Sequence, residues 1–376
     1  MIDRRGSRER EVALVACLGL VMLAGTFCQR SETGDGEGGG FRLREEAESV
    51  MPLPAVDELP RGVPIIYAGI FVDKVYELSL VSRTFSADGY IWLEWPATVQ
   101  TLMEEQAIAP LDLVRLLNRI EIWDSTFETV TEKPRELSAG RFYQRYRFSS
   151  RFYDDEIEFH RDPFAEVNLP IILEIAQPSM SHKYAEVVLL PHHQANGFMG
   201  RAGSLSGYEL AESTFKPFLH AYPSRFGSWY TPTYSQIRLE MIYEADYWSA
   251  FVNWVFPLLI IMSVVLLSPS VAGALGDVRI AIPSTALLTL IFLQQSYHDE
   301  LPPLPYLTFL DQLFAVSYAI ALGLFGLFTW GTNLYSKVAP EDRAEASRRI
   351  DRTDLVFQLV ALFLFIAVAG AAWVRS

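Results

Sequence analysis

A stripe of acidic, polar and bulky apolar residues in the last third of the chain has the spacing of one helix face. Its members recur three and four positions apart, and such positions share a face of an α-helix. The stripe consists of Asp277, Ala281, Thr285, Leu288, Phe292, Gln295 and Asp299. Carboxylates at both ends attract cations, and an apolar ring between them can close a narrow aqueous path by dewetting. The spacing therefore predicts the lining of an ion pathway.

Two interpretations of this stripe follow from the spacing alone. In the first, Leu288 and Phe292 pack in the core of a helical bundle. In the second, the stripe faces water and lines a pore. One helix cannot enclose a pore, so the second interpretation requires several copies of the chain around an axis.

The other chemistry-bearing residues give no sign of an active site. The two cysteines, Cys17 and Cys28, lie near the N-terminus, which leaves the rest of the chain without a thiol nucleophile or thiolate ligand. No P-loop, dinucleotide turn, nucleophile elbow or zinc-hydrolase helix occurs. The acidic run Asp154, Asp155 and Glu156 offers oxygens for calcium, but a solvated strand edge is the better interpretation. We expect no enzyme, no metal and no cofactor.

Composition indicates a membrane protein with a sizeable aqueous part. Half of the 376 residues are hydrophobic and 20% are charged. The formal net charge is −14. Nucleic acid is therefore not an expected partner, because a phosphate backbone requires clustered basic residues.

The N-terminal segment has the pattern of a targeting signal. Arginines precede an apolar run at residues 12–27, which is too short to cross about 30 Å of hydrocarbon. We interpret residues 1–28 as a signal peptide and residues 29–59 as a disordered leader. Lipoprotein cleavage at Cys17 and an uncleaved signal anchor are the alternatives.

Residues 60–245 have the pattern of short strands. Runs rich in Val, Ile, Tyr, Phe and Trp predict strands at 65–80, 85–95, 141–148, 157–160, 169–175, 185–190, 208–218 and 234–243. A helix is predicted at 111–119, where apolar residues recur at helical spacing. Regularly spaced strands favour an antiparallel β-sandwich.

Residues 246–376 hold four apolar segments, at 247–267, 280–297, 306–330 and 355–374. The first, third and fourth are long enough to cross a bilayer. The second carries more polar residues, which suits a helix that faces protein or water. Lys and Arg gather between the third and fourth segments, and the positive-inside rule assigns that loop to the cytoplasm. The β domain and the C-terminus then lie outside.

A long motif after the second apolar segment resembles one from a known channel family. Residues 300–312, ELPPLPYLTFLDQ, are similar to the connection between the second and third membrane helices of bacterial pentameric ligand-gated ion channels. Pro257 in the first membrane segment fits the family, and residues 70–95 are similar to its first two extracellular strands. The resemblance covers roughly residues 60–376 and favours the pore interpretation of the stripe.

The resemblance implies five subunits, a binding site between neighbours and a pore lined by the second membrane helix. Leu288 takes the place of the family's hydrophobic gate, and Asp277 that of a cation-selecting acid. The implied ligand-binding residues are Tyr90, Gln177, Tyr222, Phe226, Trp229, Tyr230 and Tyr234. The implied coupling residues are Asp162, Pro163, Phe164, Pro302, Pro305 and Tyr306.

Some positions depart from the family or have two interpretations. The aromatic residues suit an ammonium ligand, but Gln177 and Ser179 stand where an amine-binding relative carries an acid and an aromatic residue, which argues against simple transfer of an amine agonist. Arg279 matches a basic position that points away from the pore, although a snorkelling anchor predicts the same residue. Pro283 lies inside the second membrane helix and predicts a late helix start or a kink.

The sequence thus predicts a multi-pass protein of the bacterial inner membrane. An extracellular antiparallel β-sandwich (60–245), on the periplasmic or extracellular side, precedes a four-helix transmembrane bundle (246–376), and the chains assemble as a homopentamer. The expected function is a ligand-gated channel for monovalent cations, opened by a small-molecule agonist or by protons. One alternative is a non-conducting membrane ligand sensor of the same architecture. The other is a tetraspan bundle protein with an unrelated β domain that acts as a structural or assembly partner.

Overall fold

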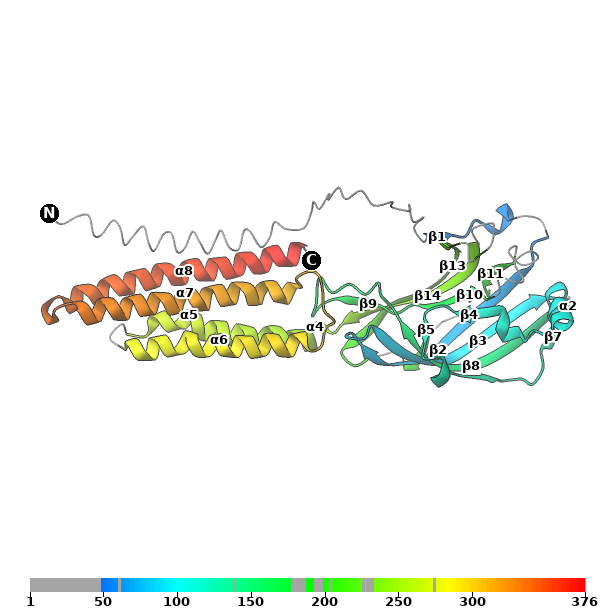
Figure 1. Cartoon of the computed structure of the whole chain (residues 1–376), viewed down its shortest axis with the longest axis horizontal. Helices are drawn as coiled ribbons and strands as arrows, with labels where there is room; N and C mark the ends of the chain where they lie inside the picture. The colour runs from blue at the N-terminus through cyan, green and yellow to red at the C-terminus, as the bar shows by residue number, and fades with distance from the viewer. Residues whose placement is uncertain are drawn as a thin grey trace. The chain divides into compact units, whose positions relative to one another are not determined.

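The computed structural model describes residues 49–59, 62–137, 140–176, 187–192, 199–202, 205–224, 227, 233–272 and 275–375. These residues form two compact units (Figure 1). The β unit extends to Val252 and includes His298–Pro305, and the helical unit comprises Asn253–Tyr297 and the chain from Tyr306 onward. Residues 1–48, with the predicted signal peptide and most of the predicted leader, lie outside the described residues.

The first sheet of the β unit has six strands in the order β1-β13-β14-β10-β4, with β9 paired to β14. Its strands are β1 (Ser49–Pro52), β4 (Val114–Leu116), β9 (Glu166–Asn168), β10 (Ile171–Ile175), β13 (Tyr208–Ala221) and β14 (Thr233–Ala245). All of these pairs are antiparallel. Strand β1 lies within the stretch that the sequence analysis assigned to the leader.

The second sheet has eight strands in the order β11-β2-β3-β8-β5, with β12 on β2 and with β6 and β7 on β8. Its strands are β2 (Ile65–Ser79), β3 (Thr84–Pro96), β5 (Arg119–Ile120), β6 (Thr126–Thr129), β7 (Arg135–Leu137), β8 (Arg141–Tyr153), β11 (Val188–Pro191) and β12 (Met199–Ala202). Strands β11 and β12 run parallel to β2, and the other pairs are antiparallel. The predicted β-sandwich is confirmed as a sandwich-like pair of sheets.

The core of the β unit comes from both sheets. Trp95 on β3, Phe148 and Phe152 on β8 and Tyr243 on β14 are fully buried. Residues of β3 from Asp88 onward alternate between buried and half-buried, as expected for a strand with one face on the core. Gly69 on β2 pairs with Trp92, and a Cβ at Gly69 would overlap the indole ring. Glycine is therefore required at this position.

Two local predictions in the β unit are wrong. Residues 111–119 form the 3₁₀ turn η2 (Pro110–Leu113) followed by β4, and the α-helix of this region is α2 (Ala97–Gln106). Pairing of β4 with β10 overrides the weak helical periodicity, since a short segment follows its tertiary partner. Residues 157–160 lie between β8 and β9 without strand pairing.

The helical unit contains α5 (Phe256–Leu267), α6 (Gly276–His298), α7 (Phe309–Lys337) and α8 (Arg343–Arg375). Helix α4 (Tyr247–Ala250) and a π-helical turn, η4 (Phe251–Val255), precede α5. Among the described residues, four stretches are long and apolar enough to cross a membrane: Tyr247–Ser270, Gly276–His298, Phe309–Lys337 and Pro340–Val374. The multi-pass prediction is thus supported, and α8 begins well before residue 355.

Local sequence explains where α6 and α7 begin. Thr308 caps α7, because its hydroxyl accepts a hydrogen bond from the Asp311 N–H while the Asp311 carboxylate accepts one from the Thr308 N–H. The late start that Pro283 predicted is wrong, since α6 begins at Gly276 and includes Pro283. Pro283 is buried, so packing of this helix face offsets the missing hydrogen bond.

Candidate ligand site and pore face

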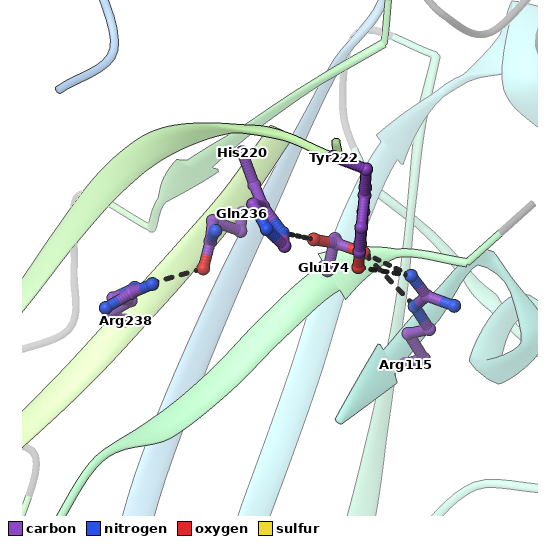
Figure 2. Close-up of polar contacts among 6 residues, drawn as sticks. All are labelled: Arg115, Glu174, His220, Tyr222, Gln236 and Arg238. Carbon is purple, nitrogen blue, oxygen red and sulfur yellow. Dashed lines mark hydrogen bonds and ion pairs between the residues drawn. The ribbon is translucent and has the colours of Figure 1, made fainter. Parts of the chain in front are cut away.

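A buried carboxylate organises one end of the six-stranded sheet. Glu174 on β10 is fully buried, and strand register places Arg115 of β4 and Gln236 of β14 on either side of it. Figure 2 shows the Glu174 carboxylate between His220 and Arg115. His220 Nδ1 lies 2.7 Å from Glu174 Oε2, and Arg115 Nη2 donates to Glu174 Oε1 at 2.5 Å. Glu174 is therefore held by a cation on one side and an imidazole on the other.

Two tyrosines complete this cluster. The Tyr222 hydroxyl donates to Glu174 Oε1 at 2.8 Å and accepts from Arg115 Nη2 at 2.7 Å. The Tyr222 and Tyr234 rings meet edge to face, with centroids 5.3 Å apart. The Arg115 guanidinium carbon lies 5.9 Å from the Tyr222 ring centroid and 5.8 Å from that of Tyr234. We call Arg115, Glu174, His220, Tyr222 and Tyr234 the Glu174 cluster.

The electrostatics of the Glu174 cluster keep its ion pair charged. Burial alone would raise the pKa of Glu174, but hydrogen bonds from His220, Arg115 and Tyr222 lower it below its usual value. Burial opposes the charge of Arg115 too, yet the bond to Glu174 raises its pKa. Burial and the charge of Glu174 raise the pKa of Tyr222. At neutral pH the cluster thus contains a carboxylate, a guanidinium and a neutral phenol.

Tyr90 lies in the other sheet, on β3, with one face turned to a second arginine. The guanidinium carbon of Arg145, on the neighbouring strand β8, lies 5.4 Å from the Tyr90 ring centroid. Arg145 forms no ion pair with any residue that the structure describes.

The structure brings together some of the predicted ligand residues. Tyr222 and Tyr234 are in contact, and Tyr90 lies in the second sheet of the chain. Gln177, Phe226, Trp229 and Tyr230 lie outside the described residues. Sequence reasoning missed Arg115, Glu174 and His220. The acid inside the apolar run of β10 is the one signal that could have pointed to a buried charge there.

A second carboxylate with the same kinds of partner lies in the eight-stranded sheet. Glu94 pairs with Arg141 and lies 3.0 Å from His192 Nε2. Burial alone would raise the pKa of Glu94, but the bonds with His192 and Arg141 lower it. The Arg141 guanidinium also lies 4.8 Å from the Tyr67 ring centroid. His192 is thus part of a structural ion-pair network.

The stripe of α6 faces away from the helical unit of its own chain. Every member, from Asp277 to Asp299, is exposed, with Leu288 at 54% and Phe292 at 66%. The opposite face carries the buried residues Arg279, Pro283, Ala286, Leu290 and Tyr297. The interpretation of Leu288 and Phe292 as bundle core is therefore wrong for the single chain.

The exposed face of α6 differs in chemistry from that of α8. Besides Asp277, α6 exposes Ser284, Thr285, Thr289, Gln295 and Ser296, and the exposed Asp299 follows its last residue. Between Leu355 and Val374, the exposed residues of α8 are all apolar, among them Leu359, Phe363 and Ile366. Apolar side chains suit lipid, whereas polar side chains at membrane depth require water or protein. The exposed faces of the two helices therefore differ in polarity.

Arg279 connects the buried face of α6 to α8. Its guanidinium pairs with Asp354, both side chains are 3% exposed, and it lies 4.2 Å from the centroid of the Phe328 ring on α7. A snorkelling side chain would reach solvent, so that interpretation of Arg279 is wrong. Arg279 joins three helices on the side away from the stripe.

The predicted coupling residues of the β unit lie near the start of β13 and the end of β14. The Phe164 ring stacks on that of Tyr247, with centroids 5.7 Å apart. Burial and the negative charges of Asp162 and Glu300 raise the pKa of Tyr208, the first residue of β13. Pro163 and Pro302 are buried, Pro305 is exposed and Tyr306 is half-buried. The loop after α6 thus lies close to the Asp162 loop within one compact unit.

No group of three or more His, Cys, Asp or Glu side chains that could hold a metal occurs among the described residues. Neither a scan of protein-family models nor a search of curated proteins finds a match to this chain.

Proposed function

We propose that this chain is a subunit of a homopentameric, ligand-gated, cation-selective ion channel of the bacterial inner membrane. The β unit lies on the periplasmic or extracellular side and binds a small molecule or protons. The stripe of α6 lines the pore, and monovalent cations pass along it.

The exposed face of α6 carries this proposal. It combines carboxylates at both ends, hydroxyl and amide groups along its length and the apolar pair Leu288 and Phe292 in the middle. Such a face is costly against lipid, because its carboxylate and amide groups lose their hydration there. Arranged around an axis, five copies give acidic rings at the two mouths and an apolar constriction between them.

Ligand binding and opening connect through the β unit. In the proposed assembly, Tyr222 and Tyr234 of one subunit face Tyr90 of the next, so that a ligand changes the fit between neighbours. Phe164, on the Asp162 loop, contacts Tyr247 at the beginning of the first membrane segment. The Asp162 loop and the loop after α6 carry the change toward the pore helix.

The test is the reversal potential of the purified, full-length protein in a planar bilayer under a salt gradient. Openers are sought by scanning pH and by adding small carboxylates and amines. We expect currents that reverse near the cation equilibrium potential. Leu288→Thr should increase leak or open probability, because a hydroxyl wets the constriction.

Leu359→Thr is the matched control for this variant. Leu359 is 59% exposed on the apolar face of α8, close to the 54% of Leu288, and receives the same substitution. Its currents should equal those of the wild type. Persistent silence from a verified pentamer would favour the non-conducting sensor instead, and equal effects of both variants would remove Leu288 from the gate.

A further inference from the structure

The described rings of the proposed ligand site each face an arginine of their own chain. Tyr222 and Tyr234 lie 5.9 and 5.8 Å from the Arg115 guanidinium carbon, and Tyr90 lies 5.4 Å from that of Arg145. An aromatic face attracts a cation through its quadrupole. At these rings the protein itself supplies the cation.

Arg115 is fixed in this position by its bonds. Its Nε and Nη2 donate to Glu174 Oε1 at 3.1 and 2.5 Å, and Nη2 also donates to the Tyr222 hydroxyl. Glu174 is fully buried and cannot be left without its partner, because an unpaired buried charge costs several kcal/mol. An ammonium ligand would therefore meet a cation that cannot move away.

Donor groups remain available on both arginines. The Arg115 side chain is 43% exposed, and its Nη1 forms no hydrogen bond with the residues that the structure describes. Arg145 is exposed and has no ion-pair partner among them. A guanidinium presents planar N–H donors that match a carboxylate.

We propose that the site takes a ligand with a carboxylate or similar planar acidic group, which Arg115 binds and which Arg145 of the neighbouring subunit also contacts. The tyrosine rings pack against the apolar part of this ligand, and amines without an acidic group are rejected. This inference rests on the proposed function only in placing Tyr90 and Arg145 opposite the Glu174 cluster.

Ligand binding to the full-length protein in detergent tests the inference without any current. The probes are butanoate and benzoate, compared with butylammonium and benzylammonium at equal ionic strength, and the readout is the unfolding temperature as a function of probe concentration. We expect a saturable rise with the carboxylates and none with the ammonium ions.

Variants of the two arginines localise the binding. Arg145→Gln removes an exposed, unpaired charge and should weaken carboxylate binding about tenfold while the protein stays folded. Arg115→Lys keeps a cation beside Glu174 but loses the planar fork, and should weaken binding at least as much. Arg151→Gln is the control, because Arg151 lies on the same strand as Arg145 and already pairs with Glu121 at 3.3 Å. It should bind like the wild type.

Several results would overturn the inference: tighter binding of the ammonium probes, no carboxylate binding to the pentamer, or unchanged binding in Arg145→Gln and Arg115→Lys. If Arg115→Lys does not fold, the wild-type probe comparison and Arg145→Gln still decide. Carboxylate binding without any current would leave this inference standing and contradict the channel, whereas cation currents without carboxylate binding would do the reverse.

Discussion

Asp154 is a single carboxyl group whose surroundings make the β unit sensitive to pH. It follows β8, is 6% exposed, and accepts a hydrogen bond from the Glu156 N–H. Burial, with the charges of Glu156 and Asp155, raises the pKa of Asp154 to about 6. The folded state therefore binds a proton that the unfolded state releases. The resulting stabilisation is complete below the usual aspartate pKa of 3.8 and is lost as pH rises through about 6.

Asp154→Asn should remove this pH dependence. The amide keeps an acceptor for the Glu156 N–H but has no charge to bury, so stability at pH 7.5 should rise by about 1–2 kcal/mol, with little change at pH 4. Thermal unfolding of the purified protein at both pH values measures the difference. Asp155→Asn, at an exposed neighbour, is the control. Equal shifts in the two variants would show that net charge, not burial of Asp154, sets the pH response.

Single residues of the site were only partly predictable from sequence. The aromatic pair Tyr222 and Tyr234 was identified through the resemblance, and the structure places the two rings in contact. Arg115 falls in the segment predicted as a helix, so the sequence did not predict its pairing with Glu174, which is 59 residues away. Contacts at such separation depend on strand register, which no local pattern specifies.

At the scale of elements, α6 has two faces with different roles. One face is the stripe, and the other is anchored to α8 through the buried pair Arg279 and Asp354. The Arg279 Nε has no hydrogen-bond partner among the residues that the structure describes, so the pair is the main compensation for burying this guanidinium. Helical periodicity identified the stripe, but it left open whether the stripe is core or pore lining, and it could not say which helix the opposite face contacts.

Asp354→Asn should destabilise the helical unit strongly. The guanidinium of Arg279 would stay buried without an anion, which costs about 3–5 kcal/mol. The double variant Arg279→Met with Asp354→Leu should recover most of this loss, because apolar side chains fill the same space without charge. Thermal unfolding in detergent compares these variants with Asp351→Asn, an exposed acid on α8. A double variant as unstable as the single one would mean that shape, rather than charge pairing, holds α6 against α8.

The division of the whole chain into a β unit and a helical unit was predictable from two sequence patterns. Strand-like runs and long apolar segments gave the sheet region and the four membrane-crossing helices, because period and length are averaged over many residues. The number of subunits is a property of several chains. In the proposed assembly it depends on the exposed faces of α6 and of the β unit, which the fold of one chain leaves uncovered.

In a homopentamer, a substitution at a residue that lines the pore changes five side chains at once. Asp277 is the residue for which we expect the largest effect on ion selectivity. It is exposed in the first turn of α6, so a fivefold pore would place five carboxylates at one mouth. Asp277→Arg reverses all of these charges at once and should reduce or invert cation preference, because permeant ions at this ring are barely screened. The reversal potential under a salt gradient measures the change.

Glu341→Arg is the control for this variant. Glu341 is an exposed acid in the loop between α7 and α8, so the substitution makes the same charge change away from the stripe and should leave the reversal potential unaltered. If Asp277→Arg also leaves it unaltered while Leu288→Thr still opens the pore, selectivity lies at Asp299 or elsewhere along the stripe.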